Sequence, residues 1–264
     1  MAIVNDVINA FSVIAPASDM EKGEYDNVGL LVGKRRSKVT KVLCCLDVTR
    51  AVIDEAINLG AELIVSHHPM IYAPIRSVTT DDVTGDKVVK AIENHIAIYA
   101  AHTNLDFTPD GINDYAAELL DLNETSVMCP FGQSGAGMGR VGVLGQATTA
   151  GKLGELCKDV FHDDFVRIIG DKNAVVNRVA VINGAGGGDV KYIDAAIDAG
   201  ADCLVTADVK HHVAVYAADR GFTLIEPQHY TMEHVYIGKL AAKLREKLPE
   251  LDIFVSEKDI IPRV

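Results

Sequence analysis

The feature that most constrains the fold is a segment that occurs twice in the chain. Residues 52–66, VIDEAINLGAELIVS, match residues 192–206, YIDAAIDAGADCLVT, at Ile, Asp, Ala, Gly and Val positions. Each copy has the pattern of an amphipathic helix that ends near a glycine and is followed by a short apolar strand. Chance is the alternative to duplication, because small residues at a helix end let any helix pack closely on a sheet. We favour duplication of an α/β unit.

The segments around both copies also match in type. A strand precedes each copy, over residues 41–48 and 178–184, and a helix and a strand follow each copy. This alternation of strands and helices predicts parallel α/β sheets. We also expect helices over 86–95, 212–221 and 232–248, a helix from Thr148 or Thr149, strands over 96–101, 139–146, 165–171 and 222–227, and a glycine-rich loop over 128–140. The expected halves are residues 1–125 and 126–264.

Charge and hydropathy argue against several classes of protein. The 264 residues carry a formal net charge of −12 at pH 7, which argues against a broad surface for nucleic acid or an anionic membrane. No apolar run reaches the length of a membrane span, and residues 1–16 fit an amphipathic helix better than a signal peptide. The five cysteines form no C-x-x-C pair, which is typical of reduced thiols, so we expect a cytoplasmic protein.

Six of the nine histidines lie just beyond the ends of expected strands, where α/β folds place their sites. They are His67, His68 and His102 in the first half, and His211, His212 and His229 in the second. Carboxylates follow two of them at four residues' distance, as Asp106 and Glu233. A single histidine at such a place is more often structural or exposed than a ligand. Imidazoles and carboxylates gathered at matching strand ends are typical of a site for zinc, iron, manganese or nickel.

The spacing of these residues suggests two ions. His229 and Glu233 fall on one face of a helix, so both can reach the same ion. The adjacent side chains of His67 and His68 are expected to diverge, which favours one imidazole for each of two ions. Carboxylates can bridge such a pair of metal ions about 3.5–4 Å apart.

Several motifs resemble one known family along nearly the whole chain. They are YDNVGLLVG (25–33), SHHP (66–69), HTNLD (102–106), TADVKHH (206–212) and HYTME (229–233). In these motifs the chain resembles the NIF-three-like dinuclear-metal family, many of whose members are called GTP cyclohydrolase 1 type 2 homologs. Two positions depart from the family pattern, with Tyr25 in place of a tryptophan and Gln228 in place of a glycine.

The resemblance implies a fold, a metal centre and an assembly. The implied fold is α/β, with two linked, pseudo-repeated halves and a dinuclear metal site between them. The implied ligands of its two divalent transition-metal ions are His67, His68, Asp106, His229 and Glu233. Zinc or iron is our first choice, with manganese or nickel as alternatives. Family members often assemble as hexamers, so we expect a homo-oligomer. Longer members carry an inserted domain that this chain lacks.

Other residues are candidates for catalysis or substrate binding. His102 and His211, or His212 in place of His211, are candidate general acids or could orient the ligands. Asp26 and Asn27 are typical of a turn or cap, but the resemblance favours a place in the site. Asp208 and Lys210 complete the candidate substrate contacts. Arg140 and the amides of 184–188 could attract an anion, although a tight turn is the simpler interpretation of the glycines. Asp163 and Asp164 are typical of a solvated turn.

The first functional hypothesis is a metal-dependent hydrolase that acts on a small, nucleotide-like molecule. Opening of the GTP ring is the reaction that the resemblance implies. A metal-dependent phosphoesterase is the alternative, because few basic residues are available for a triphosphate. A metal-binding protein with a regulatory or metal-handling role and no turnover is the hypothesis from a different class.

Overall fold

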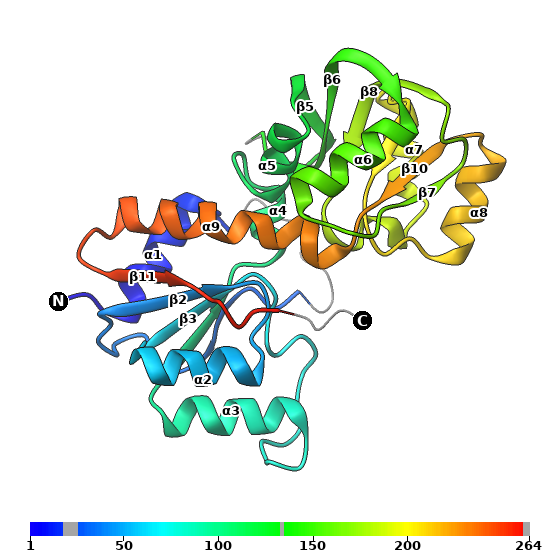
Figure 1. Ribbon diagram of the computed structural model, residues 1–264. Coiled ribbons are helices and arrows are strands. Elements are labelled where there is room, and N and C mark those ends of the chain that lie inside the picture. Colours follow the sequence, from blue (N-terminus) through cyan, green and yellow to red (C-terminus); the bar gives the residue numbers. More distant parts are fainter. Residues whose placement is uncertain (18–25, 133–134, 261–264) are drawn as a thin grey trace. The chain divides into compact units, whose positions relative to one another are not determined.

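A computed structural model describes residues 1–17, 26–132 and 135–260 (Figure 1). Tyr25, one of the two departures from the family pattern, lies outside the described residues. The chain forms two compact units, residues 1–105 with 237–264, and residues 106–236. These limits differ from the division expected near residue 125, which lies within the strand β5 (Leu122–Pro130). The C-terminal residues belong to the first unit because their strand pairs with its sheet.

The first unit has a five-stranded sheet in the order β1-β4-β3-β2-β11. Strands β2, β3, β4 and β11 run parallel, and β1 pairs antiparallel with β4 at the edge. The strands are β1 (Gly29–Val32), β2 (Lys41–Cys45), β3 (Leu63–Ser66), β4 (Ala97–Ala100) and β11 (Asp252–Val255). The helices are α1 (Val4–Ile14), α2 (Arg50–Leu59) and α3 (Val83–Glu93).

Helices cover both faces of this sheet (Figure 1). Alternate strand residues, such as Leu43 and Ile64, join the side chains of α2 and α3 in one apolar core. On the other face α1 packs through Phe11, whose ring lies 4.8 Å from that of Tyr99 on β4. Burial on both faces explains why these strands have continuous apolar sequences rather than alternating ones.

The second unit has a six-stranded sheet in the order β5-β6-β8-β9-β10-β7. Strands β8, β9 and β10 run parallel, the hairpin β5–β6 extends one side antiparallel, and β7 pairs antiparallel with β10. The strands are β5, β6 (Gly137–Thr149), β7 (Arg167–Ile169), β8 (Val175–Val181), β9 (Cys203–Val205) and β10 (Thr223–Glu226). The helical elements are α5 (Ile112–Leu119), α6 (Ala150–Phe161), η1 (Gly184–Gly188), α7 (Lys191–Asp198) and α8 (His211–Asp219).

Alternating strand residues divide the core of the second unit between the two faces of its sheet. Val179 and Val205 pack with α5 and α6, whereas Ala180 and Leu204 pack with α7 and α8. Two helices continue from one unit to the next along the chain, α4 (Thr103–Phe107) and α9 (His229–Lys247). Each unit is therefore a three-layer α/β sandwich with its own core.

The predicted α/β fold class and the pseudo-repeat are confirmed. The series β1-β2-α2-β3-α3-β4 of the first unit matches the series β7-β8-α7-β9-α8-β10 of the second, with the same parallel and antiparallel pairings. Gly60 takes a left-handed conformation at the end of α2, with φ 67°, and Gly200 follows α7 with φ 75°. The glycine in each copy thus ends a helix, as the sequence predicts.

The glycine-rich loop expected over 128–140 is wrong in extent. Most of that stretch belongs to the hairpin of β5 and β6, which pair from Leu122 with Leu144 to Pro130 with Gly137. Strands β1, β5 and β11, each at the edge of a sheet, were also missed. In β5, polar residues interrupt the apolar sequence, so its pattern differs from that of the central strands. In the part of the chain that the structure describes, none of the helices combines the length and the hydropathy that a membrane crossing requires.

Candidate metal centre

Three imidazoles come together in the first unit. Strand β3 ends at Ser66, whose hydroxyl donates to the carbonyl oxygen of His68 at 2.8 Å, so the chain turns at once after the strand. The ring centroids of His67 and His68 are 4.9 Å apart, and His102, which follows β4, lies 5.4 and 5.9 Å from them. One ring nitrogen from each lies within 4.8 Å of the others. The turn after β3 thus places the two rings side by side, and one imidazole for each of two ions stays a prediction.

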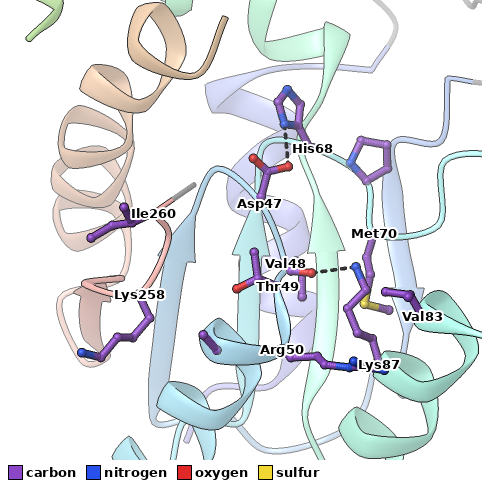
Figure 2. A pocket seen from close by; sticks show the side chains of 12 residues that line it. Asp47, Val48, Thr49, Arg50, His68, Met70, Val83, Lys87, Lys258 and Ile260 are labelled. Atoms are coloured by element: carbon purple, nitrogen blue, oxygen red, sulfur yellow. Dashed lines mark hydrogen bonds and ion pairs between the residues drawn. The ribbon is translucent and has the colours of Figure 1, made fainter. Parts of the chain in front are cut away.

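Each of the three imidazoles is held through Nδ1. The acceptors are the carbonyl oxygen of Ala101 for His67, at 2.8 Å, Oδ1 of Asp47 for His68, at 2.9 Å (Figure 2), and Oδ1 of Asp26 for His102, at 2.8 Å. A carbonyl oxygen cannot donate, so the proton of His67 is on Nδ1. In a neutral ring Nε2 then carries the lone pair that binds a metal, which is the usual arrangement of a histidine ligand.

Asp26 is an ionised partner for His102. Burial raises the pKa of its carboxyl, but hydrogen bonds from His102 and Thr103 outweigh burial, so the net pKa is below its usual value. Asn27 has a different role, since its Nδ2 donates to the carbonyl oxygen of Ile71 at 2.6 Å. The structure thus brings Asp26 to the imidazoles, whereas Asn27 fixes the loop that follows the histidine pair.

Asp47 is a residue that the sequence did not assign to the site. The N-cap of α2 is Thr49, whose hydroxyl accepts from the amide of Val52 at 3.1 Å. Asp47 instead accepts from His68. Its place two residues after β2, at the same sheet edge as the histidine pair, was the available signal.

A second cluster, of one imidazole and two carboxylates, lies in the second unit. His229 begins α9 and Glu233 follows one turn later, with Nε2 of His229 and Oε2 of Glu233 2.9 Å apart. Asp106 on α4 brings a carboxylate oxygen within 4.8 Å of one from Glu233. Both carboxylates are buried, with 8% and 2% of Asp106 and Glu233 exposed. Buried carboxylates this close repel each other unless a proton or a cation lies between them.

His229 is also held through Nδ1, which lies 2.7 Å from Oδ2 of Asp208. Asp208 follows β9 in the left-handed conformation, with φ 52°. The sequence named Asp208 as a substrate contact, which stays a prediction, and the structure shows it in contact with His229. Four histidines of the two clusters thus share one arrangement, an acceptor at Nδ1.

Gly184 lies against the second cluster. Its φ is +62°, and a Cβ there would overlap Oε1 of Glu233 and lie 3.3 Å from Nε2 of His229. No other residue type fits without displacing that carboxylate. Gly184 opens the turn η1, so the glycines there serve close packing, as the simpler interpretation of the sequence proposed.

The start of α9 is fixed by a buried acid. Asp163 is 3% exposed and accepts from the amide of Gln228 at 2.6 Å, from Nε2 of Gln228 at 2.8 Å and from the hydroxyl of Thr231 at 2.7 Å. The solvated turn expected at Asp163 and Asp164 is therefore wrong for Asp163. Gln228, which stands where the family pattern has a glycine, binds this acid through its amide and its side chain. Together the two residues position the start of α9, which carries His229.

Other candidates lie apart from the clusters. His211 and His212 are exposed on the first turn of α8, next to the exposed Lys210. Arg140 is buried and binds both carboxylate oxygens of Asp114, each at 2.6 Å. Arg140 is consequently a structural cation of the second unit.

Fold and side chains together define a class, a two-unit α/β protein with candidate metal ligands in each unit. The family model described as Duf34/NIF3 (NGG1p interacting factor 3) matches residues 2–262, and the chain belongs to this family. The resemblance noted in the sequence is thereby confirmed.

Relatives and solved structures agree with this assignment. The chain is 36% identical to a GTP cyclohydrolase 1 type 2 homolog of Clostridium perfringens, over 97% of this chain and 96% of that protein. It is 34% identical to a protein of the same name in Clostridium acetobutylicum, over 98% and 97% of the two chains. The crystal structure of a Bacillus cereus protein related to NIF3 matches with a TM-score of 0.92 at 26% identity, over 100% and 99%.

Proposed function

We propose that the protein binds two divalent transition-metal ions and uses them to hydrolyse a small, nucleotide-like molecule. The proposed ligands are His67, His68, Asp106, His229 and Glu233. The observation that supports them best is the shared arrangement at Nδ1, because a metal-ligating histidine almost always donates its other nitrogen to a carbonyl or carboxylate. Mixed nitrogen and oxygen ligands suit zinc or iron, with manganese or nickel as alternatives.

The burial of Asp106 and Glu233 supports the same proposal. Carboxylates taken out of water need a cation or a hydrogen-bond network, because desolvation of an uncompensated charge costs several kcal/mol. Glu233 is the proposed bridging ligand. When bound, two ions would activate a water molecule for attack by lowering its pKa.

His102 has two chemical roles that its geometry supports. It shares the imidazole cluster of the first unit, so it can serve as a further nitrogen ligand. Its Nδ1 also lies 2.8 Å from Oδ1 of Asp26, and an acceptor at Nδ1 orients the ring as a general acid requires. We keep general acid as the proposal. His211, exposed on α8, is the weaker candidate.

The relatives' printed name makes opening of the GTP imidazole ring the specific candidate reaction. Water would add at C8, the bond from C8 to the ring nitrogen would break with a proton delivered to that nitrogen, and a second water would release formate. His102 is the proposed donor of that proton. Hydrolysis of a phosphoester is the second candidate, since the same pair of ions can serve it.

The test of the proposed reaction is incubation of metal-loaded protein with GTP and with a phosphomonoester. Release of formate supports GTP ring opening, and His102→Ala should then slow turnover about 10²–10⁴-fold while metal content is kept. Phosphate release without formate would move the assignment to a phosphoesterase. No turnover of either compound would support a metal-handling or regulatory protein.

The proposed oligomeric state is a homo-oligomer, and the proposed compartment is the cytoplasm. We infer from the family resemblance that the chain forms a homo-oligomer, with a hexamer as the expected state, which light scattering at micromolar concentration would check. The five cysteines are free thiols, and four are buried, which supports a reducing compartment, the cytoplasm.

A further inference from the structure

A pocket lies in the first unit beside His68. Its volume is about 600 Å³, within the range of small-molecule sites. Its lining comes from the ends of β2 and β3, the first turns of α2 and α3, and the C-terminal segment (Figure 2). In Figure 2, Lys258 and Ile260 lie on one side, Met70, Val83 and Lys87 lie on the other, and Asp47 and His68 lie at one end.

Three basic side chains line this one pocket of an acidic chain, Arg50, Lys87 and Lys258. Arg50 uses Nε to bind Asp86, at 2.7 Å, so its two terminal amino groups remain available. Lys258 is exposed, and among the described residues no carboxylate pairs with its Nζ. The sequence had pointed to Arg140 and Lys210 as the cations for an anion, whereas Arg140 is committed to Asp114.

Lys87 adds a partly buried cation to the pocket. Its Nζ donates to the carbonyl oxygen of Val48 at 2.9 Å, as Figure 2 shows. Burial lowers the pKa of this ammonium below its usual value, because the charged form has lost water. An anion bound nearby would restore part of the lost solvation.

The rest of the lining determines what kind of anion fits. Val48, Pro69, Met70, Val83 and Ile260 make much of the wall apolar. Thr49 and Arg50 also place the start of α2 at the pocket, where helix amides favour negative charge. An apolar wall with basic groups suits a flat or apolar body that carries phosphate, rather than a free inorganic anion.

From this lining we propose that the pocket binds the phosphate-bearing part of the substrate and places its remainder at His68. The substrate class is a phosphorylated heterocycle such as a nucleotide. This inference rests on the proposed function, because it takes His68 as part of the reaction site. It also removes the objection that the chain has too few cations for a phosphorylated substrate.

The experiment measures binding by calorimetry, first on protein stripped of metal with a chelator. GTP, GMP, guanosine and pyrophosphate are the probes, and Arg50→Gln, Lys258→Gln and Lys34→Gln are compared with the wild type. Arg50→Gln and Lys258→Gln should each weaken GTP binding about tenfold and leave guanosine binding unchanged. Lys34 is the matched control, since it is an exposed lysine at a different pocket of the same unit.

A variant that is expected to strengthen GTP binding distinguishes an electrostatic effect from damage to the fold. Asp86→Asn removes the carboxylate that binds Arg50, so GTP should bind about two- to threefold more tightly to it. Loss of GTP and guanosine affinity in equal measure, or an unchanged GTP affinity in both pocket variants, would overturn the proposal. So would a wild type that binds no phosphorylated probe at millimolar concentration.

Failure of the phosphate pocket and failure of the proposed hydrolase give different results. Metal content and turnover are measured separately, on reconstituted samples of the same variants. Weakened GTP binding with normal metal content but no turnover would keep the phosphate pocket and reject the hydrolase. Normal turnover with unchanged GTP binding in both pocket variants would keep the hydrolase and reject the phosphate pocket.

Discussion

The two units share one backbone plan and use it differently. Val65 pairs with Tyr99 in the first sheet and Val205 with Ile225 in the second, so the strand ends can be aligned residue by residue. His67 and His68 then correspond to Ala207 and Asp208. The first unit thus places imidazoles directly at its strand ends. The second unit has small or acidic residues there and presents His229 and Glu233 from a helix.

This difference extends to the neighbouring strand. Cys44 pairs with Val65 and Val181 with Val205, so Asp47 of the first unit corresponds to Gly184 of the second. Asp47 supports an imidazole from its own sheet edge, whereas Gly184 leaves room for the carboxylate of Glu233. A repeated fold therefore does not imply repeated chemistry. The second His–His pair, at 211 and 212, lies exposed on the first turn of α8.

The largest expected effect contrasts one ligand from each unit. If Glu233 bridges, Glu233→Ala should deplete both ions, whereas His68→Ala should remove about one. Elemental analysis of the two purified variants beside the wild type measures this. His212→Ala is the control, because its imidazole is exposed on α8. Equal metal content in the Glu233 and His68 variants would contradict the bridging assignment.

The next effect tests the space that Gly184 provides. Gly184→Ala should lower metal affinity about 100-fold, because the new methyl group displaces Glu233 from the position that Gly184 permits. Gly188→Ala is the matched control in the same turn, since its Cβ would meet only Lys210, at 3.6 Å from Nζ. Competition with a chromogenic chelator gives both affinities. Similar affinities in the two variants would refute the role of Gly184.

A smaller effect is expected from the acids that support the imidazoles. Asp47→Asn and Asp208→Asn should each lower metal affinity about tenfold, by weakening the acceptor at Nδ1 of His68 and of His229. The exposed Asp164 provides the control, as Asp164→Asn. If only one of the two variants loses affinity, the shared arrangement of the imidazoles is not a general property of the site.

The smallest effect concerns the first unit alone, through the buried Asp259. Its carboxylate accepts from the amides of Leu46 and Asp47, yet burial raises its pKa to about 6. The Asp47 carboxylate also raises this pKa, whereas His68 lowers it. Because the folded state then binds more protons than the unfolded state, stability should fall as pH rises, by about 1 kcal/mol between pH 5 and pH 6.

Urea denaturation of metal-free protein at these two pH values measures that dependence. Asp259→Asn should flatten it, and the exposed Asp252→Asn on β11 should leave it unchanged. An unaltered slope in the Asp259 variant would show that the buried acid does not titrate in this range.

The sequence predicted most of what depends on local pattern. Apolar runs and helix-capping residues predicted the central strands and helices of both units, and Gly60 and Gly200 marked the ends of the repeated helices. The division of the chain into two units was harder to predict from the sequence, because the pairing of β11 with β2 joins residues far apart in sequence. Edge strands such as β5 were missed for lack of a continuous apolar pattern.

The candidate site was predictable in its residue types but not in its contacts. Strand-end histidines and the spacing of His229 and Glu233 are visible in the sequence. The support from Asp47, the burial of Asp163 and the approach of Gly184 to Glu233 arise from packing between distant segments. Likewise, Arg50 and Lys258 come to one pocket only because the C-terminal segment returns to the first sheet.

The most direct test of the central claim is anomalous diffraction from crystals of the metal-reconstituted protein. We predict two peaks per chain, about 3.5–4 Å apart, with nitrogen and oxygen ligand atoms about 2.0–2.2 Å from them. Nε2 of His67, His68 and His229 should face the peaks, with each Nδ1 still on its acceptor. Ordered side chains at all five positions with no anomalous peak would contradict the account.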